Sequence, residues 1–287
     1  MGNGAFTILP MSQRFSLEAG GVYEGSIKIV NPADATENFS YKASVSPYGV
    51  VGNDYAADLT TMTGRSEIAK WITIEEPVGE VEPNTTKEIK FTIRVPENAP
   101  AGGQYATIAV SSNASSQSSS GVAVQNIFEM ASIVYANVSG ETVHKGEVLE
   151  NNIPGFVTTV PIRLSALVSN EGNTHEDATF LIAVSDFFTG RVILPTEEDN
   201  GHYSELIMPE TTRNVEREIN NLPSIGIMKV SQTIYYNGEV YIAEKKVVIC
   251  PVWFMILLLV TIIAIIATIV SLVVKHKKRK KRQKIAV

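Results

Sequence analysis

Cysteine is almost missing from this 287-residue sequence. Its single thiol, Cys250, leaves no pair that could form a disulfide within the chain. Small exported domains often depend on disulfides, whereas a domain of more than 100 residues can be held by its hydrophobic core alone. Any exported part of this chain therefore has to be stabilised by the burial of hydrophobic side chains in a core. An unmodified thiol and an acylated one both remain open for Cys250, which lies next to an apolar segment.

Catalytic and metal-binding motifs are also missing. The histidines form no His-x-x-x-His or His-Glu-x-x-His pair, and the sequence has no Gly-x-Ser-x-Gly elbow and no phosphate-binding glycine loop. Glu197–Asn200 is acidic enough for weak calcium binding but lacks spaced ligands, and a solvated turn is the simpler interpretation. Asp54 and Asp58 flank Tyr55, a pairing that glycosidases use, although nothing else in the sequence suggests a substrate pocket. We therefore expect a protein that is not an enzyme and has no cofactor and no bound metal.

Acidic residues are absent after Pro251. The preceding 250 residues hold 16 Lys and Arg against 30 Asp and Glu, a balance of −14, whereas the remaining residues carry +8. An ectodomain this acidic would repel nucleic-acid phosphates, so nucleic acid is excluded as a partner. Basic proteins, cations and uncharged polymers remain as partners that this charge favours.

One uncharged run dominates the C-terminal part of the chain. Val252–Val274 contains 23 residues without a charge, and a helix of that length spans roughly 34 Å, enough to cross a bilayer. Trp253 and Phe254 suit the membrane interface, and Pro251 suits the first turn of a helix. We predict a single transmembrane helix at 251–274, with the lipid bilayer as its partner.

A basic tail follows this run at 275–287. The positive-inside rule places the tail in the cytoplasm and residues up to about 250 outside, in a single-pass protein of the cell membrane. The start of the sequence, MGNGAFTILP, has no basic n-region or apolar h-region, so we expect that a signal peptide has been removed. A nucleic-acid patch and a specific lipid site are the other interpretations of such a basic run. The eight basic residues are Lys275, Lys277, Lys278, Arg279, Lys280, Lys281, Arg282 and Lys284.

Alternation of apolar and polar residues indicates an all-β ectodomain. The segments 23–29, 39–45 and 89–95 alternate with period 2, which is typical of antiparallel strands with one buried face. Turn signals such as Asn31-Pro32 and Glu82-Pro83-Asn84 separate them, and no long amphipathic helix interrupts them. Short strands with such punctuation predict immunoglobulin-like β-sandwiches.

Two sandwiches fit the length of the ectodomain. The Ser-rich segment 111–121 could be an interdomain linker, but strand-like sequence on both sides favours a long hairpin loop. We place the first sandwich at 1–139 and the second at 140–250. Strands of the second are expected at Thr158–Ser169, Ala178–Ser185 and Met228–Tyr236, and the last is expected to turn at Asn237-Gly238 into Val240–Ile249.

Two stretches of the first sandwich resemble a known family. ILPMSQRFSLEAGGVYEGSIKIVNPADATENFSYKASVSPY and KWITIEEPVGEVEPNTTKEIKFTIRVPENAPAGGQYATIAV look like the N-terminal domain of the bacterial WxL-interacting proteins. LSALVSNEGNTHEDATFLIAVSDFFTGRVI and the closing hairpin are similar in order and length to the second domain. The resemblance implies a wall-associated protein of Gram-positive bacteria with two immunoglobulin-like domains, a transmembrane helix and a basic tail. It also implies peptidoglycan binding by the first domain and binding of a secreted protein by the second.

Aromatic residues offer the clearest hint of a binding site. Tyr48, Tyr55 and Trp71 are expected near loops and strand ends, where rings can stack on sugars or anchor a protein, although a place in the core or at its rim is the simpler interpretation of each. We expect a cell-surface adaptor that binds a cell-wall polymer, an exported protein or both. An exported assembly chaperone that acts by strand addition and an accessory subunit of a surface hydrolase are the alternatives.

Overall fold

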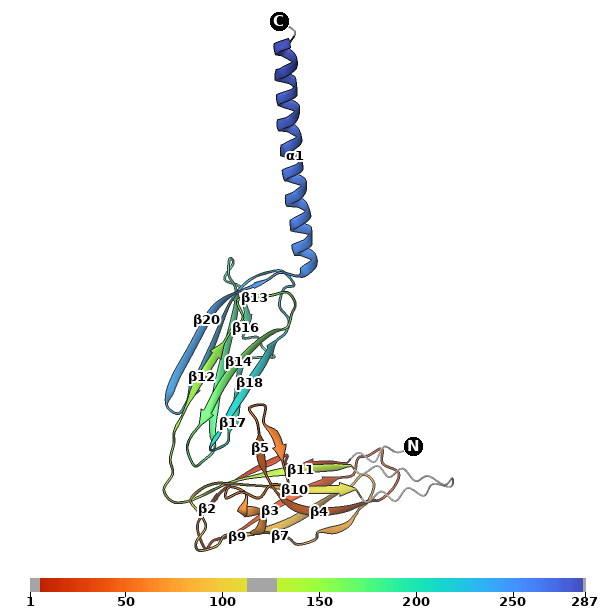
Figure 1. Cartoon of the computed structure of the whole chain (residues 1–287). Coiled ribbons are helices and arrows are strands. Elements are labelled where there is room, and N and C mark those ends of the chain that lie inside the picture. Colours follow the sequence, from red (N-terminus) through yellow and green to blue (C-terminus); the bar gives the residue numbers. More distant parts are fainter. Residues whose placement is uncertain (1–5, 113–127, 286–287) are drawn as a thin grey trace. The chain divides into compact units, whose positions relative to one another are not determined.

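The computed structural model describes residues 6–112 and 128–285, with side chains to Lys275 (Figure 1). Strands make up most of the chain up to Ile249, and one long helix, α1 (Val252–Ile285), follows them. The predicted fold class, immunoglobulin-like sandwiches followed by one apolar helix, is confirmed. The Ser-rich segment predicted to be a hairpin loop lies, from residue 113 onward, outside the described residues.

The chain forms two compact units. The first comprises Met1–Leu149, Leu167–Ala178 and Glu205–Asn214, and the second comprises Glu150–Ala166, Thr179–Ser204 and Val215–Val287. Several strands of the second sandwich therefore contribute residues to both units. The predicted boundary between the two sandwiches near residue 139 stays a prediction.

The first sandwich has two sheets, with strand orders β1-β3-β9-β7 and β2-β11-β10-β4-β8. β10 pairs with β11 in antiparallel register from Gly102↔Val138 to Ser111↔Glu129, so both flanks of the Ser-rich segment belong to neighbouring strands. A short hairpin, β5 with β6, projects from this sandwich. The strands are β1 (Thr7–Leu9), β2 (Ser12–Leu17), β3 (Val22–Val30), β4 (Phe39–Pro47), β5 (Gly49–Val51), β6 (Ala56–Asp58), β7 (Ile72–Ile74), β8 (Val78–Val81), β9 (Thr86–Arg94), β10 (Gly102–Ser112) and β11 (Glu129–Val138), with a 3₁₀ turn at Glu67–Lys70.

The core of the first sandwich is built by the alternation that the sequence shows. In β9, Ile89, Phe91 and Ile93 are buried, while Lys90 is exposed between two of them. At β3 the glycine Gly25 faces Phe91 across the sheet, and a Cβ there would lie 2.3 Å from the ring. The aromatic ring thus occupies the space that a side chain at residue 25 would need. A larger residue at that position would force the ring out of the core.

The second sandwich pairs a three-stranded sheet, β12-β14-β18, with a larger sheet ordered β13-β20-β19-β15-β16, in which β17 also pairs with β15. The strands are β12 (Gly146–Asn152), β13 (Phe156–Val157), β14 (Ile162–Asn170), β15 (Glu176–Asp186), β16 (Val192–Leu194), β17 (His202–Ile207), β18 (Thr211–Ile219), β19 (Gly226–Tyr236) and β20 (Glu239–Ile249). Five of these strands were not predicted from the sequence: β13 and β16 are only two and three residues long, and the polar faces of β12, β17 and β18 weaken the period-2 signal.

The predicted closing hairpin is present at Asn237-Gly238. Both residues have positive φ, 53° and 79°, which a two-residue type I′ turn requires and which Asn and Gly adopt most readily. β19 and β20 pair without a break from Tyr236↔Glu239 to Gly226↔Ile249. This hairpin leads directly to the helix.

α1 begins where the sequence predicts, because the N–H groups of Phe254 and Met255 both donate to the carbonyl of Pro251. Val252–Lys275 is long and apolar enough to cross a membrane, with a mean hydropathy of 3.1, and none of it is buried against the rest of the chain. The helix continues to Ile285, beyond the predicted end at residue 274. The basic tail is therefore helical through most of its length, while its side chains after Lys275 lie outside the described residues.

Candidate functional site

β20 has an open edge along most of its length. On one side it pairs with β19 over all eleven residues, whereas β13 covers the other side only at Val248 and Ile249. Among the described residues, no strand pairs with this side from Glu239 to Val247. A row of backbone donors and acceptors is thus available to an additional strand.

The hydrogen bonds at the end of β20 show which backbone groups face outward. The N–H of Val248 donates to the carbonyl of Gly155, away from β19, and the N–H of Cys250 donates to the carbonyl of Val157. Because the direction of backbone groups repeats every two residues in a strand, the outward groups belong to the even-numbered residues. These are Val240, Ile242, Glu244 and Lys246 on the uncovered part.

The outer face beside this edge is apolar. Ile242 is 70% exposed and Val240 is 53% exposed, and in register they lie opposite Thr233 and Tyr235 of β19. Leu181 of β15 lies opposite Thr233 on its other side and is also exposed. Natural sheets usually protect long edges with charge, proline or a bulge, whereas the outer face of β20 next to the turn presents Val240 and Ile242. We call this the β20 surface. It consists of the open edge of β20 and the side chains of Tyr235, Val240, Ile242 and Leu181.

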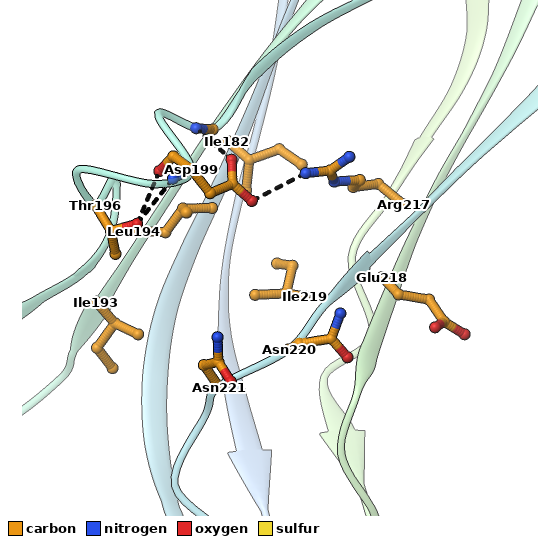
Figure 2. Close-up of a pocket in the computed structure, with 11 residues that line it drawn as sticks. Ile182, Ile193, Leu194, Thr196, Asp199, Arg217, Glu218, Ile219, Asn220 and Asn221 are labelled. Atoms are coloured by element: carbon orange, nitrogen blue, oxygen red, sulfur yellow. Dashed lines mark hydrogen bonds and ion pairs between the residues drawn. The ribbon is translucent and has the colours of Figure 1, made fainter. Parts of the chain in front are cut away.

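A polar pocket of about 400 Å³ lies in the second unit (Figure 2). Its apolar floor includes Ile182, Leu194 and Ile219, and its rim holds Asp199 and Arg217. The Asp199 carboxylate is 2.9 Å from a guanidinium nitrogen of Arg217 and also accepts the N–H of Gly201 at 2.9 Å. Asp199 and Arg217 neutralise each other, and the third charged lining residue, Glu218, pairs with Arg163 at 2.8 Å, so the pocket presents neither a free acid nor a free base.

The acidic turn that was considered for calcium is used for local structure. Thr196 and Asp199 exchange hydrogen bonds that close the turn, and Asn200 accepts the N–H of His202. In the part of the chain that the structure describes, no group of three His, Cys, Asp or Glu side chains could hold a metal ion. A similar local role explains Asp58, whose pKa is held below its usual range by hydrogen bonds from Thr61 and Thr60.

The three aromatic residues predicted as binding residues occupy different environments. Trp71 is only 8% exposed and belongs to the core of the first sandwich. Tyr48 packs edge-on against Tyr135, with 6.1 Å between ring centroids. The Tyr55 hydroxyl accepts the N–H of Met208 at 3.0 Å. No ring contact joins the three among the residues described, and their role in binding stays a prediction.

Tyr55 is held by further contacts inside the first unit. Its hydroxyl shares a short hydrogen bond with Thr211, and the guanidinium of Arg213 lies 4.7 Å from the ring centroid. Burial raises the pKa of the Tyr55 phenol, so its proton remains available as a donor. These contacts tie the β5–β6 hairpin to residues 208–213 and leave little of the ring free.

His175 lies in an aromatic cluster of the first unit. Its Nδ1 is 3.2 Å from the hydroxyl of buried Tyr105, and its ring contacts that of Tyr135. Burial lowers the pKa of His175, and the positive charge of Arg14 lowers it further, although Asp177 acts in the opposite direction. Arg14 and Asp177 form a two-bond ion pair at 2.6 and 2.8 Å beside it. The folded unit therefore disfavours the protonated imidazole.

This environment predicts an acid-sensitive first unit. Because the folded state binds the His175 proton less tightly than the unfolded chain does, its contribution to stability is complete above the ordinary pKa of 6.5 and is lost as the pH falls below it. We expect the urea midpoint of this unit, followed by circular dichroism of the full chain in detergent, to fall between pH 7 and pH 5. His175→Gln should remove that part of the pH dependence, whereas His202→Gln, in an exposed strand position, should retain it. An unchanged pH profile in His175→Gln would contradict the assignment.

Comparisons with known proteins give distant similarities only. No family model matches the chain, and no curated protein matches it. Among solved structures, the class 5 fimbrial chaperone CfaA is similar over 84% of this chain and 99% of its own, at 13% identity and a TM-score of 0.40. The E. coli chaperone DraB is similar at 11% identity over 84% of this chain and 96% of its own, with a TM-score of 0.39. The PapD-like domain 7 of human CEP192 covers 48% of this chain and 87% of its own, at 12% identity and a TM-score of 0.32.

No statement about function follows from similarity at this level, and the resemblance to the WxL-interacting proteins stays a prediction. The candidate site rests on the geometry of β20 instead. The alternating pattern of the sequence predicted that β20 is a strand, but it did not predict that one edge of this strand is open. The sequence feature that could have indicated this surface is the pair Val240 and Ile242. These are apolar residues on the same face of the strand as the charged Glu244 and Lys246.

Proposed function

We propose that this chain is a membrane-anchored cell-surface adaptor that holds an exported protein by adding one of its strands to the edge of β20. The observation that carries the proposal is the open edge from Glu239 to Val247 beside exposed Val240 and Ile242. An incoming extended segment would gain backbone hydrogen bonds from the edge and apolar contacts from the outer face. The ectodomain balance of −14 favours a basic partner.

The anchor in this proposal is α1. Its apolar part is exposed along its whole length, as expected of a helix that lipid surrounds rather than a helix of a soluble core. From the basic tail, which begins at Lys275, we infer that this end lies in the cytoplasm and the sandwiches lie outside. Anchoring confines both the adaptor and its partner to the surface, which raises their effective concentration.

An exported assembly chaperone is the second candidate, because it would use the same edge. The two differ in what happens to the bound protein: an adaptor retains it, whereas a chaperone passes it on. Binding of a cell-wall polymer such as peptidoglycan, which the sequence resemblance implies for the first domain, is a separate expectation that the edge of β20 does not address.

Photo-crosslinking on intact cells tests the proposal. A benzophenone side chain at Ile242 should form a crosslink to an exported protein, whereas the same group at Val51, an exposed apolar residue of the β5–β6 hairpin, should not. Irradiation at increasing times after new synthesis stops separates the candidates, because the crosslinked product of an adaptor persists and that of a chaperone declines. Identical products from both positions, or none from Ile242, would contradict strand addition at β20.

A further inference from the structure

The connection between the second sandwich and α1 is very short. The N–H of Cys250 donates to the carbonyl of Val157, so Cys250 is still tied to the sandwich. The carbonyl of the next residue, Pro251, already accepts the first helical hydrogen bonds. Since consecutive Cα atoms are about 3.8 Å apart, the end of the sandwich that holds Cys250 lies within a few ångströms of the helix start.

That end of the sandwich carries a row of apolar residues. Across neighbouring strands, Phe156 pairs with Val248, and Val248 pairs with Ile227. The N–H of Phe187 then donates to the carbonyl of Ile227 at 2.9 Å, which places Phe187 at the other end of the same row. Phe156 is 51% exposed, and Phe187 is also exposed. Figure 1 shows β13, which contains Phe156, at the end of this sandwich where α1 begins.

A stiff turn presents the most exposed aromatic ring. The Asp186 carboxylate accepts the N–H groups of Phe188 and Thr189 at 3.1 and 2.7 Å, and the N–H of Gly190 donates to the Asp186 carbonyl. Phe188 is 76% exposed and packs edge-on against Phe187, with 5.3 Å between ring centroids. The turn therefore holds a large apolar ring away from the sandwich core. We call Phe156, Phe187, Phe188 and Ile225, the exposed residue next to Gly226, the basal rim.

Cations accompany these rings. The ammonium group of Lys246 lies 4.0 Å from the centroid of Phe187, and Arg191 is exposed just after the turn. The carboxylate of the same turn, Asp186, is occupied by the turn's own amides. Aromatic rings flanked by Lys and Arg are the composition that suits the boundary between lipid headgroups and acyl chains.

We propose that the basal rim enters the interfacial layer of the membrane that α1 crosses, so that the second sandwich is seated on the bilayer and held at more than one point. This inference rests on the proposed anchoring by α1 and adds a second lipid contact to it. The occupant is lipid, because the single-residue connection keeps this end of the sandwich beside the start of the helix that lipid surrounds. With the rim seated, rotation of the sandwich about the helix is restricted.

The single cysteine of the chain makes a direct test possible. In a Cys250→Ser background, a nitroxide label is attached at one position, and the full chain is reconstituted in nanodiscs of phosphatidylglycerol and phosphatidylethanolamine. Phe188→Cys reports on the rim and Val260→Cys on the middle of α1. Val240→Cys is the matched control, an exposed apolar residue at the other end of β20, roughly 30 Å along the strand.

Collision rates with oxygen, which concentrates in lipid, and with a water-soluble nickel chelate give the depth of each label. We expect the oxygen-to-nickel ratio at residue 188 to exceed that at residue 240 by at least about threefold and to remain below that at residue 260. Equal ratios at 188 and 240, with 260 in lipid, would overturn the seated rim and leave the anchor intact. A label at 188 shielded from both reagents would mean that protein covers the rim and would also overturn it. If 260 matches 240, the anchor itself fails.

Discussion

Glu244→Pro should reduce the exported protein retained by the chain at least about tenfold while the second sandwich stays folded. The N–H of residue 244 points away from β19, so proline removes a donor that only an added strand would use. Leaving the partner's carbonyl unpaired costs about 1–3 kcal/mol, and the pyrrolidine ring also occupies the path of the incoming strand. A loss of 1.4 kcal/mol is tenfold in affinity.

The salt bridge of Glu244 does not account for this effect. Its carboxylate is 3.0 Å from Lys229, but both side chains are about half exposed, and pairs of this kind contribute little to stability. Glu244→Thr is the matched control, because it removes the same charge and keeps the backbone donor. We measure the exported protein that co-purifies with the full chain from crosslinked cells, and circular dichroism checks the fold.

The two variants separate backbone recognition from charge recognition. Strand addition requires that Glu244→Pro loses the partner and that Glu244→Thr retains it. Equal losses in both variants would assign binding to the carboxylate, and full retention in both would remove β20 from the binding surface. Lys245→Pro is a reference for misfolding, because its N–H faces β19 and proline there breaks the ladder between the two strands.

Trp71→Ala should lower the stability of the first sandwich by about 3–5 kcal/mol, the usual range for removing a large aromatic side chain from a core. Trp71 is 8% exposed, follows a 3₁₀ turn in which its N–H donates to Ile68, and accepts the N–H of Arg94 at its carbonyl. Those backbone bonds survive the substitution, so the loss comes from the ring. Since domains are stable by about 5–15 kcal/mol, this one change removes a large share.

Hydrogen exchange along β9 in the full chain measures this loss, because it does not need the tryptophan as a probe. With a urea dependence of about 1–3 kcal/mol per molar, the midpoint of protection should fall by roughly 2 M. Trp71→Phe should cost less, since it keeps an aromatic ring in the core, and Val51→Ala, at an exposed position, should change stability by less than about 0.5 kcal/mol.

The same variants test the binding role for which Trp71 was a candidate. If Trp71→Ala left protection unchanged and abolished retention of the chain by isolated cell-wall sacculi, the ring would act on a ligand rather than in the core. Destabilisation in Trp71→Ala, with retention unaffected in the folded Trp71→Phe variant, would assign it to the core.

Local sequence patterns were sufficient to predict many of the strands and the closing hairpin. The alternation in 39–45 and 89–95 correctly predicted which residues of β4 and β9 are buried, because a strand with one face in a core must repeat every two residues. Asn237-Gly238 predicted its hairpin because few residues adopt positive φ at two successive positions. β17 and β18 escaped prediction because their exposed and half-buried residues do not alternate cleanly.

The candidate aromatic residues show the limit of such reasoning. Trp71, Tyr48 and Tyr55 were chosen as rings near loops, but whether a ring near a loop is free depends on what packs over it. Tyr55 is held by Met208 and Thr211, more than 150 residues away in the sequence. No local pattern encodes a contact at that separation.

Properties that depend on composition and short-range repetition can be read directly from the sequence. These are the absence of a cysteine pair, the apolar run at Val252–Val274, the charge difference between the residues before and after Pro251, and the all-β class. Which strand edge is left open, and which apolar residues remain in solvent, depends on how the strands are ordered in the folded sheets. Ile242 and Ile89 are the same residue type in similar alternating strands, yet one is 70% exposed and the other is buried. The difference arises because each strand's two edges and two faces are covered by segments distant in the sequence, and only the folded sheet order determines which edge and which face stay uncovered.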